Sequence, residues 1–210
     1  MTGKTKWWVF VLVATAMSFS LGRAFAAVPE KPNFMIIIGD DMTWHDCEPY
    51  GNAVIHTPNL QRLADEGMCF DAMFTATAMC APTRQQLYTG LHPVRNGAYP
   101  NHSRVREGTK SIVHHLESLG YRVALMGKTH YKPPESFPFE YLGDIRQGKI
   151  DEAKLAEFIN RDPDQPYCVV VASHEPHSPW NIGDPSQYDP ADFVVPPYLY
   201  DCPETREAMR

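Results

Sequence analysis

Apolar residues fall along the chain in two alternating patterns, short continuous runs and amphipathic stretches with helical spacing. Residues 34–38 form a continuous apolar run that ends in Gly39-Asp40-Asp41, which predicts a buried strand of a parallel sheet with acids at its carboxyl end. The other predicted strands are 68–74, 121–126 and 167–172. The predicted helices are 58–66, 82–89, 111–119, 151–160 and a last one that begins at about Glu204. Helices that alternate with apolar strands indicate an α/β fold with a mostly parallel sheet.

The carboxyl ends of the predicted strands carry the polar residues with candidate chemistry. In an open α/β sheet, ligands gather beyond these ends. Three ends stand out: Asp40-Asp41, Gly127-Lys128-Thr129-His130 and Ser173-His174-Glu175-Pro176-His177. We therefore expect the functional site at this edge of the sheet.

The composition fits a soluble globular protein, with 43% apolar and 21% charged residues among 210. The net charge is -6, from 25 acidic residues against 19 basic ones, and no run of Lys or Arg has the pattern that tracks a phosphate backbone. Nucleic acid is therefore not an expected partner.

The first 26 residues have the pattern of a secretory signal peptide. Lys4 and Lys6 precede an apolar stretch over 7–20, and small residues follow it with a cleavage position after Ala26. The alternative is an uncleaved anchor helix, but the stretch is shorter than the roughly 18–20 residues that a membrane span needs. We expect a signal peptide over 1–26, export to the periplasm, the extracellular space or a lysosome, and no stable membrane insertion after cleavage.

The chain has five cysteines, so an exported form leaves at least one of them outside internal disulfides. One of them opens the string Cys80-Ala-Pro-Thr-Arg84, which runs into a predicted helix and continues to Leu87-Tyr-Thr-Gly90. A Cys at the head of a helix has its thiolate favoured by the helix dipole, and an Arg one turn on can hold an anion over it. A phosphatase-like cysteine nucleophile would use the same pair of residue types, but that class separates Cys from Arg by more residues.

The pattern Cys-x-Pro-Thr-Arg followed by Leu-x-Thr-Gly resembles the signature of the type I, formylglycine-dependent sulfatases. The resemblance implies an alkaline-phosphatase-like α/β fold, with a mostly parallel central sheet flanked by helices and incomplete at the C-terminus. It implies that a formylglycine-generating or other sulfatase-maturing enzyme converts Cys80 to formylglycine, whose hydrated aldehyde attacks sulfur. The implied activity is hydrolysis of sulfuric esters or sulfamates of sugars. The alternative is an ordinary buried Cys before a helix.

Asp40 and Asp41 suggest a site for a hard metal ion. Adjacent acids at the tip of a strand repel each other unless a cation lies between them, and carboxylates without a neighbouring thiol or imidazole suit Ca²⁺ or Mg²⁺. A solvated loop with an Asp pair is the alternative. The resemblance implies that Asp40, Asp41 and the residue made from Cys80 are metal ligands, with Ca²⁺ as the usual ion and Mg²⁺ possible.

The two remaining strand ends resemble the Gly-Lys-x-His and His-x-Pro-His segments of the same family. The resemblance implies this catalytic set: Cys80, Arg84, Lys128, His130 and His177. It implies that Lys128, His174 and His177 bind the substrate. Without the resemblance, Lys128 and His130 could be an ordinary surface Lys and loop His. His174 and His177 could then be half of a transition-metal site. The other histidines, among them His102, match no family site and are expected to be surface residues or loop residues with satisfied hydrogen bonds.

Several segments resemble the N-sulfoglucosamine sulfohydrolase branch of the family, among them Asn96-Gly97-Ala98-Tyr99 and the segment 137–140. They imply a sulfated saccharide of the heparan type as substrate. Family catalytic domains are roughly twice as long, so residues 27–210 are expected to be the N-terminal portion of one, with weak or no activity in isolation. A phosphonate or phosphate ester hydrolase of the same superfamily and an inactive, glycan-binding remnant are the alternatives.

Overall fold

The computed structural model describes residues 31–210 of the chain. The predicted signal peptide over 1–26 lies outside the described residues and stays a prediction. Among the helices from residue 31 onward, none combines the length and the apolar character that a membrane crossing requires.

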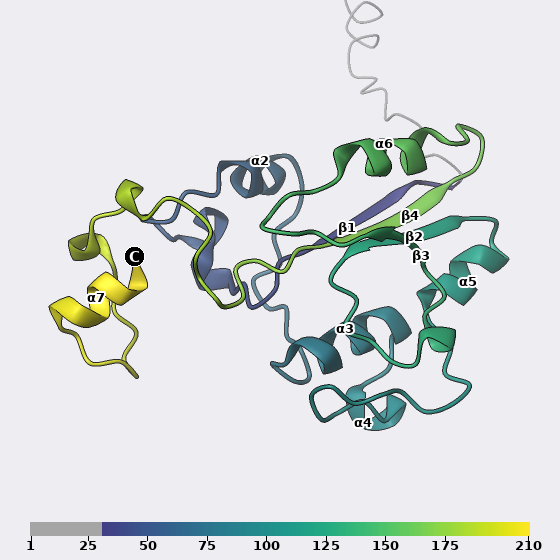
Figure 1. The fold of residues 1–210 in the computed structure, drawn as a ribbon, viewed down its shortest axis with the longest axis horizontal. Helices are drawn as coiled ribbons and strands as arrows, with labels where there is room; N and C mark the ends of the chain where they lie inside the picture. The colour runs from purple at the N-terminus through teal and green to yellow at the C-terminus, as the bar shows by residue number, and fades with distance from the viewer. Residues whose placement is uncertain (1–30) are drawn as a thin grey trace, which may run out of the picture. The chain divides into compact units, whose positions relative to one another are not determined.

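A four-stranded, all-parallel sheet forms the centre of the described part (Figure 1). Its strands are β1 (Phe34–Ile38), β2 (Arg122–Gly127), β3 (Glu140–Gly143) and β4 (Tyr167–Ala172), in the spatial order β1-β4-β2-β3. Ile38 pairs with Ala172, and Ala172 pairs with Gly127. The carboxyl ends of β1, β4 and β2 therefore stand level at one edge, so the loops that follow them meet there.

The α-helices occupy the segments between and after the strands. They are α2 (Pro58–Glu66), α3 (Cys80–Thr89), α4 (Pro93–Asn96), α5 (Ile112–Ser118), α6 (Glu152–Asn160) and α7 (Pro203–Met209). Short 3-10 helices span Trp44–Asp46, Glu48–Tyr50, Pro134–Ser136, Pro185–Gln187 and Pro190–Asp192. The α/β prediction is confirmed, and α3 begins two residues earlier than predicted, so Cys80 lies in its first turn.

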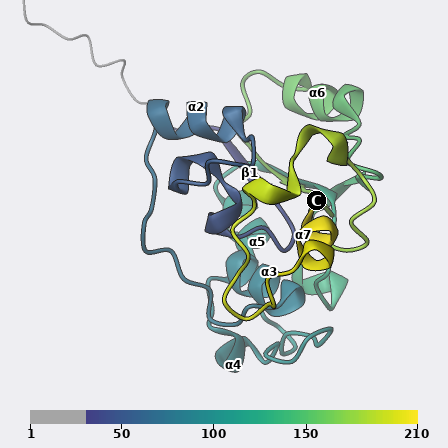
Figure 2. The same ribbon diagram turned by 90° about the vertical axis from the view of Figure 1, so that its left-hand side faces the viewer.

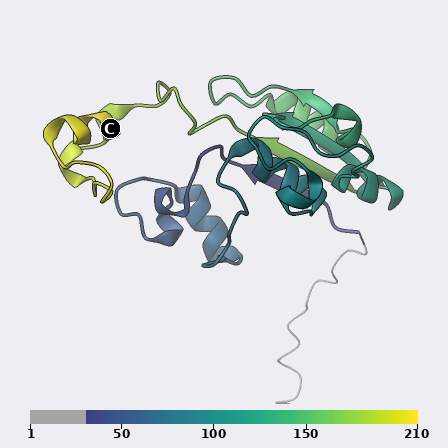
Figure 3. The same cartoon turned by 90° about the horizontal axis from the view of Figure 1, so that it is seen from below.

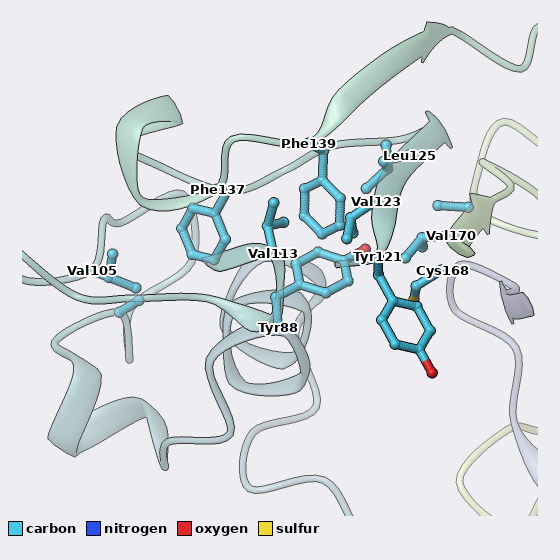
Figure 4. Close-up of a cluster of buried hydrophobic side chains, with 12 residues drawn as sticks. Tyr88, Val105, Val113, Tyr121, Val123, Leu125, Phe137, Phe139, Cys168 and Val170 are labelled. Atoms are coloured by element: carbon cyan, nitrogen blue, oxygen red, sulfur yellow. The ribbon is translucent and has the colours of Figure 1, made fainter. Parts of the chain in front are cut away.

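Helices cover both faces of the sheet, with α3 and α5 on one face and α6 on the other (Figures 1 and 2). Seen from below, α3 and α5 lie in front of the strands (Figure 3). Figure 4 shows the apolar cluster between the sheet and α3 with α5, whose labelled members are Tyr88, Val105, Val113, Tyr121, Val123, Leu125, Phe137, Phe139, Cys168 and Val170. On the other face, Phe158 of α6 packs with Met126 of β2 and Val169 of β4. This burial of apolar surface from three layers is the main stabilising contribution to the fold.

Two sequence predictions about strands are wrong. β1 is not a buried strand: Ile36 and Ile38 pack against the cluster of Figure 4, but Ile37 is 67% exposed. The reason is that β1 lies at the edge of the described sheet, and the cluster under α6 contains no residue of β1. Residues 68–74 form no strand either, because no other described segment makes backbone-to-backbone hydrogen bonds with them, and Phe70 and Phe74 are exposed. The short strand β3 has no counterpart among the predicted strands.

None of the five cysteines, all of which fall within residues 31–210, forms a disulfide in the structure. Cys168 lies on β4 and is 1% exposed, and burial raises the pKa of its thiol to about 11. Cys69 is exposed. The thiolate is the reactive form of a Cys, so the two sites should differ strongly in reactivity.

We expect iodoacetamide at mildly alkaline pH to alkylate Cys69 of the folded chain and to leave Cys168 unmodified, as measured by peptide mass spectrometry. In denaturant both should react. Equal rates at both sites in the folded chain would contradict the buried position of β4.

Candidate active site

Backbone hydrogen bonds tie together the three loops that carry the predicted site residues. The N–H of Lys128, after β2, donates to the carbonyl of Ala172 at 2.8 Å. The N–H of Ser173, after β4, donates to the carbonyl of Ile38 at 2.9 Å, and the N–H of Asp40 donates to that of Glu175 at 3.0 Å. The parallel register thus brings residues that are far apart in the sequence to one place, as predicted from the strand ends.

Asp40 is the centre of a buried charge cluster with Arg84 and Lys128. One carboxylate oxygen accepts a hydrogen bond from Nη2 of Arg84 at 3.2 Å, and the other accepts one from Nζ of Lys128. Nη1 of Arg84 also donates to the carbonyl of Lys128 at 3.1 Å. Burial alone would raise the pKa of Asp40, but the hydrogen bond from Lys128 and the charges of both cations hold it below its ordinary value. The cluster therefore contains two cations and one carboxylate, and its surplus positive charge suits an anionic ligand.

Cys80 stands in the first turn of α3, one turn before Arg84 on the same helix. Its thiol is partly exposed, and its Sγ lies 3.8 Å from Oδ1 of Asn101. The partial positive charge at the start of a ten-residue helix favours an anion at this position. The residue is thus reachable from solvent, carries no disulfide and lies on the helix that holds Arg84.

Asp41 and His177 lie at the exposed side of this edge. The side chain of Asp41 is 60% exposed, and one of its carboxylate oxygens is 3.6 Å from Nε2 of His177. Nδ1 of His177 is 2.7 Å from the carbonyl oxygen of Ser178, and because a carbonyl only accepts, Nδ1 is the donor. Nε2, which faces Asp41, is therefore the nitrogen that carries the lone pair of the neutral ring.

His174 points to a different partner from its neighbour His177. Its Nε2 lies 2.8 Å from Oδ1 of Asp144, whose other oxygen is 3.0 Å from Arg146. The structure thus places His174 against the segment that follows β3. Sequence reasoning missed Asp144, and the strand-end rule would have found it if β3 had been predicted.

His130 is paired with a residue that the sequence did not single out. Its Nε2 is 2.9 Å from Nδ1 of His102, and the ring centroids are 4.9 Å apart. The Nδ1 atom of His130 is buried and has no hydrogen-bond partner within the part of the chain that the structure describes. Burial and the charge of Lys128 lower the pKa of His130 to about 4, so its ring is neutral at neutral pH. His102 lies in a loop with no periodicity, so only the tertiary structure could reveal this contact.

The donors for the predicted metal ion fit in type but not in number. Carboxylates such as those of Asp40 and Asp41 are the ligands that Ca²⁺ and Mg²⁺ prefer, but Ca²⁺ takes about six to eight oxygens. Residues 31–210 contain no group of three or more His, Cys, Asp or Glu side chains arranged to hold a metal, and Asp40 already faces two cations. The described residues thus offer fewer donors than such an ion requires.

Three comparisons with known proteins show that this chain is similar to sulfatases. A family model described as Sulfatase matches residues 32–144. The chain is 37% identical over 166 residues to an ulvan-active sulfatase of Formosa agariphila, covering 76% of this chain and 33% of that protein. It is 28% identical over 211 residues to the human N-sulphoglucosamine sulphohydrolase, covering 83% and 42%. A protein solved with its substrate D-glucosamine-2-N,6-O-disulfate superposes with a TM-score of 0.63 at 28% identity, covering 72% of this chain and 36% of the other. The chain thus spans less than half the length of each.

Proposed function

We propose, because this chain belongs to the sulfatase family, that it carries the nucleophile and the sulfate-binding cations of a hydrolase for sulfuric esters or sulfamates of sugars. Its described part has the alkaline-phosphatase-like α/β arrangement expected for that family. The observation that carries the proposal is the buried cluster of Asp40, Arg84 and Lys128 beside the helix that begins with Cys80. A surplus positive charge in a partly dry site stabilises the charged oxygens of a sulfuryl group more strongly than it would in water.

Formylglycine made from Cys80 would supply a hydroxyl group that attacks sulfur. The chain's own residues would prepare its surroundings. Arg84, fixed by Asp40 and by the carbonyl of Lys128, holds positive charge one helical turn from residue 80. Lys128 adds a second charge from the end of β2. His177, when protonated, can give the proton on Nε2 to the leaving oxygen or nitrogen.

A divalent cation, Ca²⁺ or alternatively Mg²⁺, would neutralise further charge when bound. Asp40, Asp41 and residue 80 are the groups of this chain that would contribute ligands to it. His174 is also proposed to bind the substrate, and the contact of 2.8 Å between its Nε2 and Oδ1 of Asp144 fixes the position of its ring.

The proposed substrate is a sulfated saccharide, with N-sulfated glucosamine of the heparan type as the specific candidate. Support comes from the similarity to the human N-sulphoglucosamine sulphohydrolase and to the structure that contains a glucosamine disulfate. The proposed partner is a sulfatase-maturing enzyme, and the proposed location is an exported compartment, either periplasmic, extracellular or lysosomal.

Mass spectrometry of the peptide that contains residue 80 tests the proposal, after production of the chain together with a formylglycine-generating enzyme. We expect the mass of the aldehyde at position 80 and an unmodified thiol at Cys69, the exposed control. An aminooxy reagent should then trap the aldehyde, and N-sulfoglucosamine should slow the trapping more than an alkyl phosphonate ester does. Only thiol at position 80 would contradict the sulfatase proposal, and stronger protection by the phosphonate would favour the phosphonate hydrolase alternative.

A further inference from the structure

The loop 99–103 contacts the candidate site through two consecutive residues. Oδ1 of Asn101 lies 3.8 Å from Sγ of Cys80, and Nδ1 of His102 lies 2.9 Å from Nε2 of His130. The same loop is anchored to α3, because Nε2 of Gln85 donates to the carbonyl of Ser103 at 3.2 Å. It therefore forms a side of the site between the nucleophile helix and the segment after β2.

Both histidines of the pair hold an uncommon backbone conformation. The φ angles are 60° for His102 and 47° for His130, in the left-handed region that residues other than Gly rarely adopt. Within residues 31–210, the other non-glycine residues with positive φ are Asp41 and Gln147, and Asp41 also belongs to the site. Such strain costs on the order of 1 kcal/mol per residue and persists where surrounding contacts fix it, often at functional sites.

The hydrogen bond leaves two possible proton arrangements for a neutral pair. If His102 donates from Nδ1, the proton of His130 must lie on its own Nδ1, where a buried N–H would have no acceptor among the described residues. If His130 donates from Nε2, its Nδ1 is unprotonated and presents a lone pair. A buried donor without an acceptor is the costlier arrangement, so the unpartnered Nδ1 of His130 is the nitrogen that carries no proton.

We propose that His102 is a positioning residue for the hydrolysis: its Nδ1 accepts a hydrogen bond from the Nε2–H of His130. This bond holds the tautomer of His130 whose Nδ1 can take a proton from a hydroxyl on residue 80. In that step the O–H bond breaks, its electron pair stays on oxygen, and the N–H bond forms at Nδ1 of His130. In a catalytic triad, a carboxylate holds one nitrogen of the His so that the other nitrogen can act as a base. Here the imidazole of His102 takes the place of that carboxylate. The hydroxyl part of this inference rests on the proposed function, whereas the tautomer does not.

Burial lowers the pKa of His130 to about 4, so the ring is neutral at neutral pH and one of its two nitrogens is unprotonated. His102 is exposed, so the proton on its own Nε2 can donate a hydrogen bond to water and no buried donor is left without an acceptor.

The test compares His102→Asn with His102→Leu in the full chain. The amide oxygen of Asn overlays the position of Nδ1 and can accept the same proton, whereas Leu fills similar space without an acceptor. Long-range proton–nitrogen NMR spectra of the imidazole rings, recorded at neutral pH on the chain that still carries Cys80 as a thiol, report which nitrogen of His130 is protonated. We expect a protonated Nε2 in the wild type and in His102→Asn, and loss of this single tautomer in His102→Leu. His115→Leu, which removes an exposed His from α5, is the control and should leave the His130 signals unchanged.

Backbone amide spectra show whether each variant is folded. A proton on Nδ1 of His130 in the wild type, or an unchanged tautomer in His102→Leu, would overturn the proposal. Because these spectra need no aldehyde and no turnover, they decide the proposal separately from the mass spectrometry of residue 80, where failure of the proposed function would show.

Discussion

Replacing Asp40 with asparagine is expected to lower the free energy of unfolding by about 3–5 kcal/mol. The substitution keeps the shape of the side chain but removes the negative charge that both Arg84 and Lys128 contact. Arg84 is 2% exposed, so its guanidinium would remain buried without an opposite charge. The same change would release Lys128 from its partner and disturb the charge arrangement proposed to hold sulfate.

Asp41→Asn is the matched control for this prediction. It is the same substitution one residue later, at a side chain that is 60% exposed, and it should change stability by less than about 1 kcal/mol. Urea unfolding followed by circular dichroism measures both variants. A third variant, Asp40→Asn with Arg84→Met, should recover part of the loss, because it removes the buried unpaired charge. Equal stability of Asp40→Asn and Asp41→Asn would contradict the buried cluster.

Replacing Gly127 with alanine is expected to destabilise the fold by more than about 3 kcal/mol. Gly127 ends β2 with a φ of +94°, and a Cβ added there would lie 2.0 Å from the carbonyl oxygen of Ala172. That carbonyl accepts the hydrogen bond from the N–H of Lys128. The methyl group would therefore push apart the ends of β2 and β4 and displace Lys128 from Asp40.

Gly51→Ala separates the clash from the backbone strain. Gly51 has nearly the same φ, +93°, but a Cβ there would meet nothing within 4 Å. It should cost only the roughly 1 kcal/mol of a left-handed alanine. Thermal unfolding of the two variants gives the comparison. If Gly127→Ala lost no more stability than Gly51→Ala, this would contradict the close approach of the backbones at the ends of β2 and β4.

Most of the helices and strands follow from local pattern. The runs at 34–38, 121–126 and 167–172 correspond to the strands β1, β2 and β4, within one residue at each end. β3 escapes detection because four residues carry too little periodicity. The segment 68–74 has the residues of a strand, but a strand exists only where another one pairs with it, which no local pattern can show.

In the candidate site too, some residues follow from the sequence and others only from the tertiary structure. The predicted strand ends and the family resemblance are sufficient to single out Asp40, Lys128 and His177, because ligand sites of α/β sheets collect at carboxyl ends. The two contacts made by His174 with Asp144 and by His130 with His102 needed the tertiary structure. Each joins loops that are about thirty residues apart in the sequence or slightly less, and their approach depends on how the chain packs.

The sequence by itself determined the class of fold, the family and the residues that carry the candidate chemistry, because these depend on hydrophobic period and on local motifs. Only the tertiary structure decided how the charges are shared: Asp40 is buried between Arg84 and Lys128, whereas its neighbour Asp41 is largely exposed. Both residues are aspartates, so the sequence alone does not distinguish them. They differ because α3 and the loop after β2 bring Arg84 and Lys128 to Asp40, whereas Asp41, where the backbone has a φ of 59°, faces water.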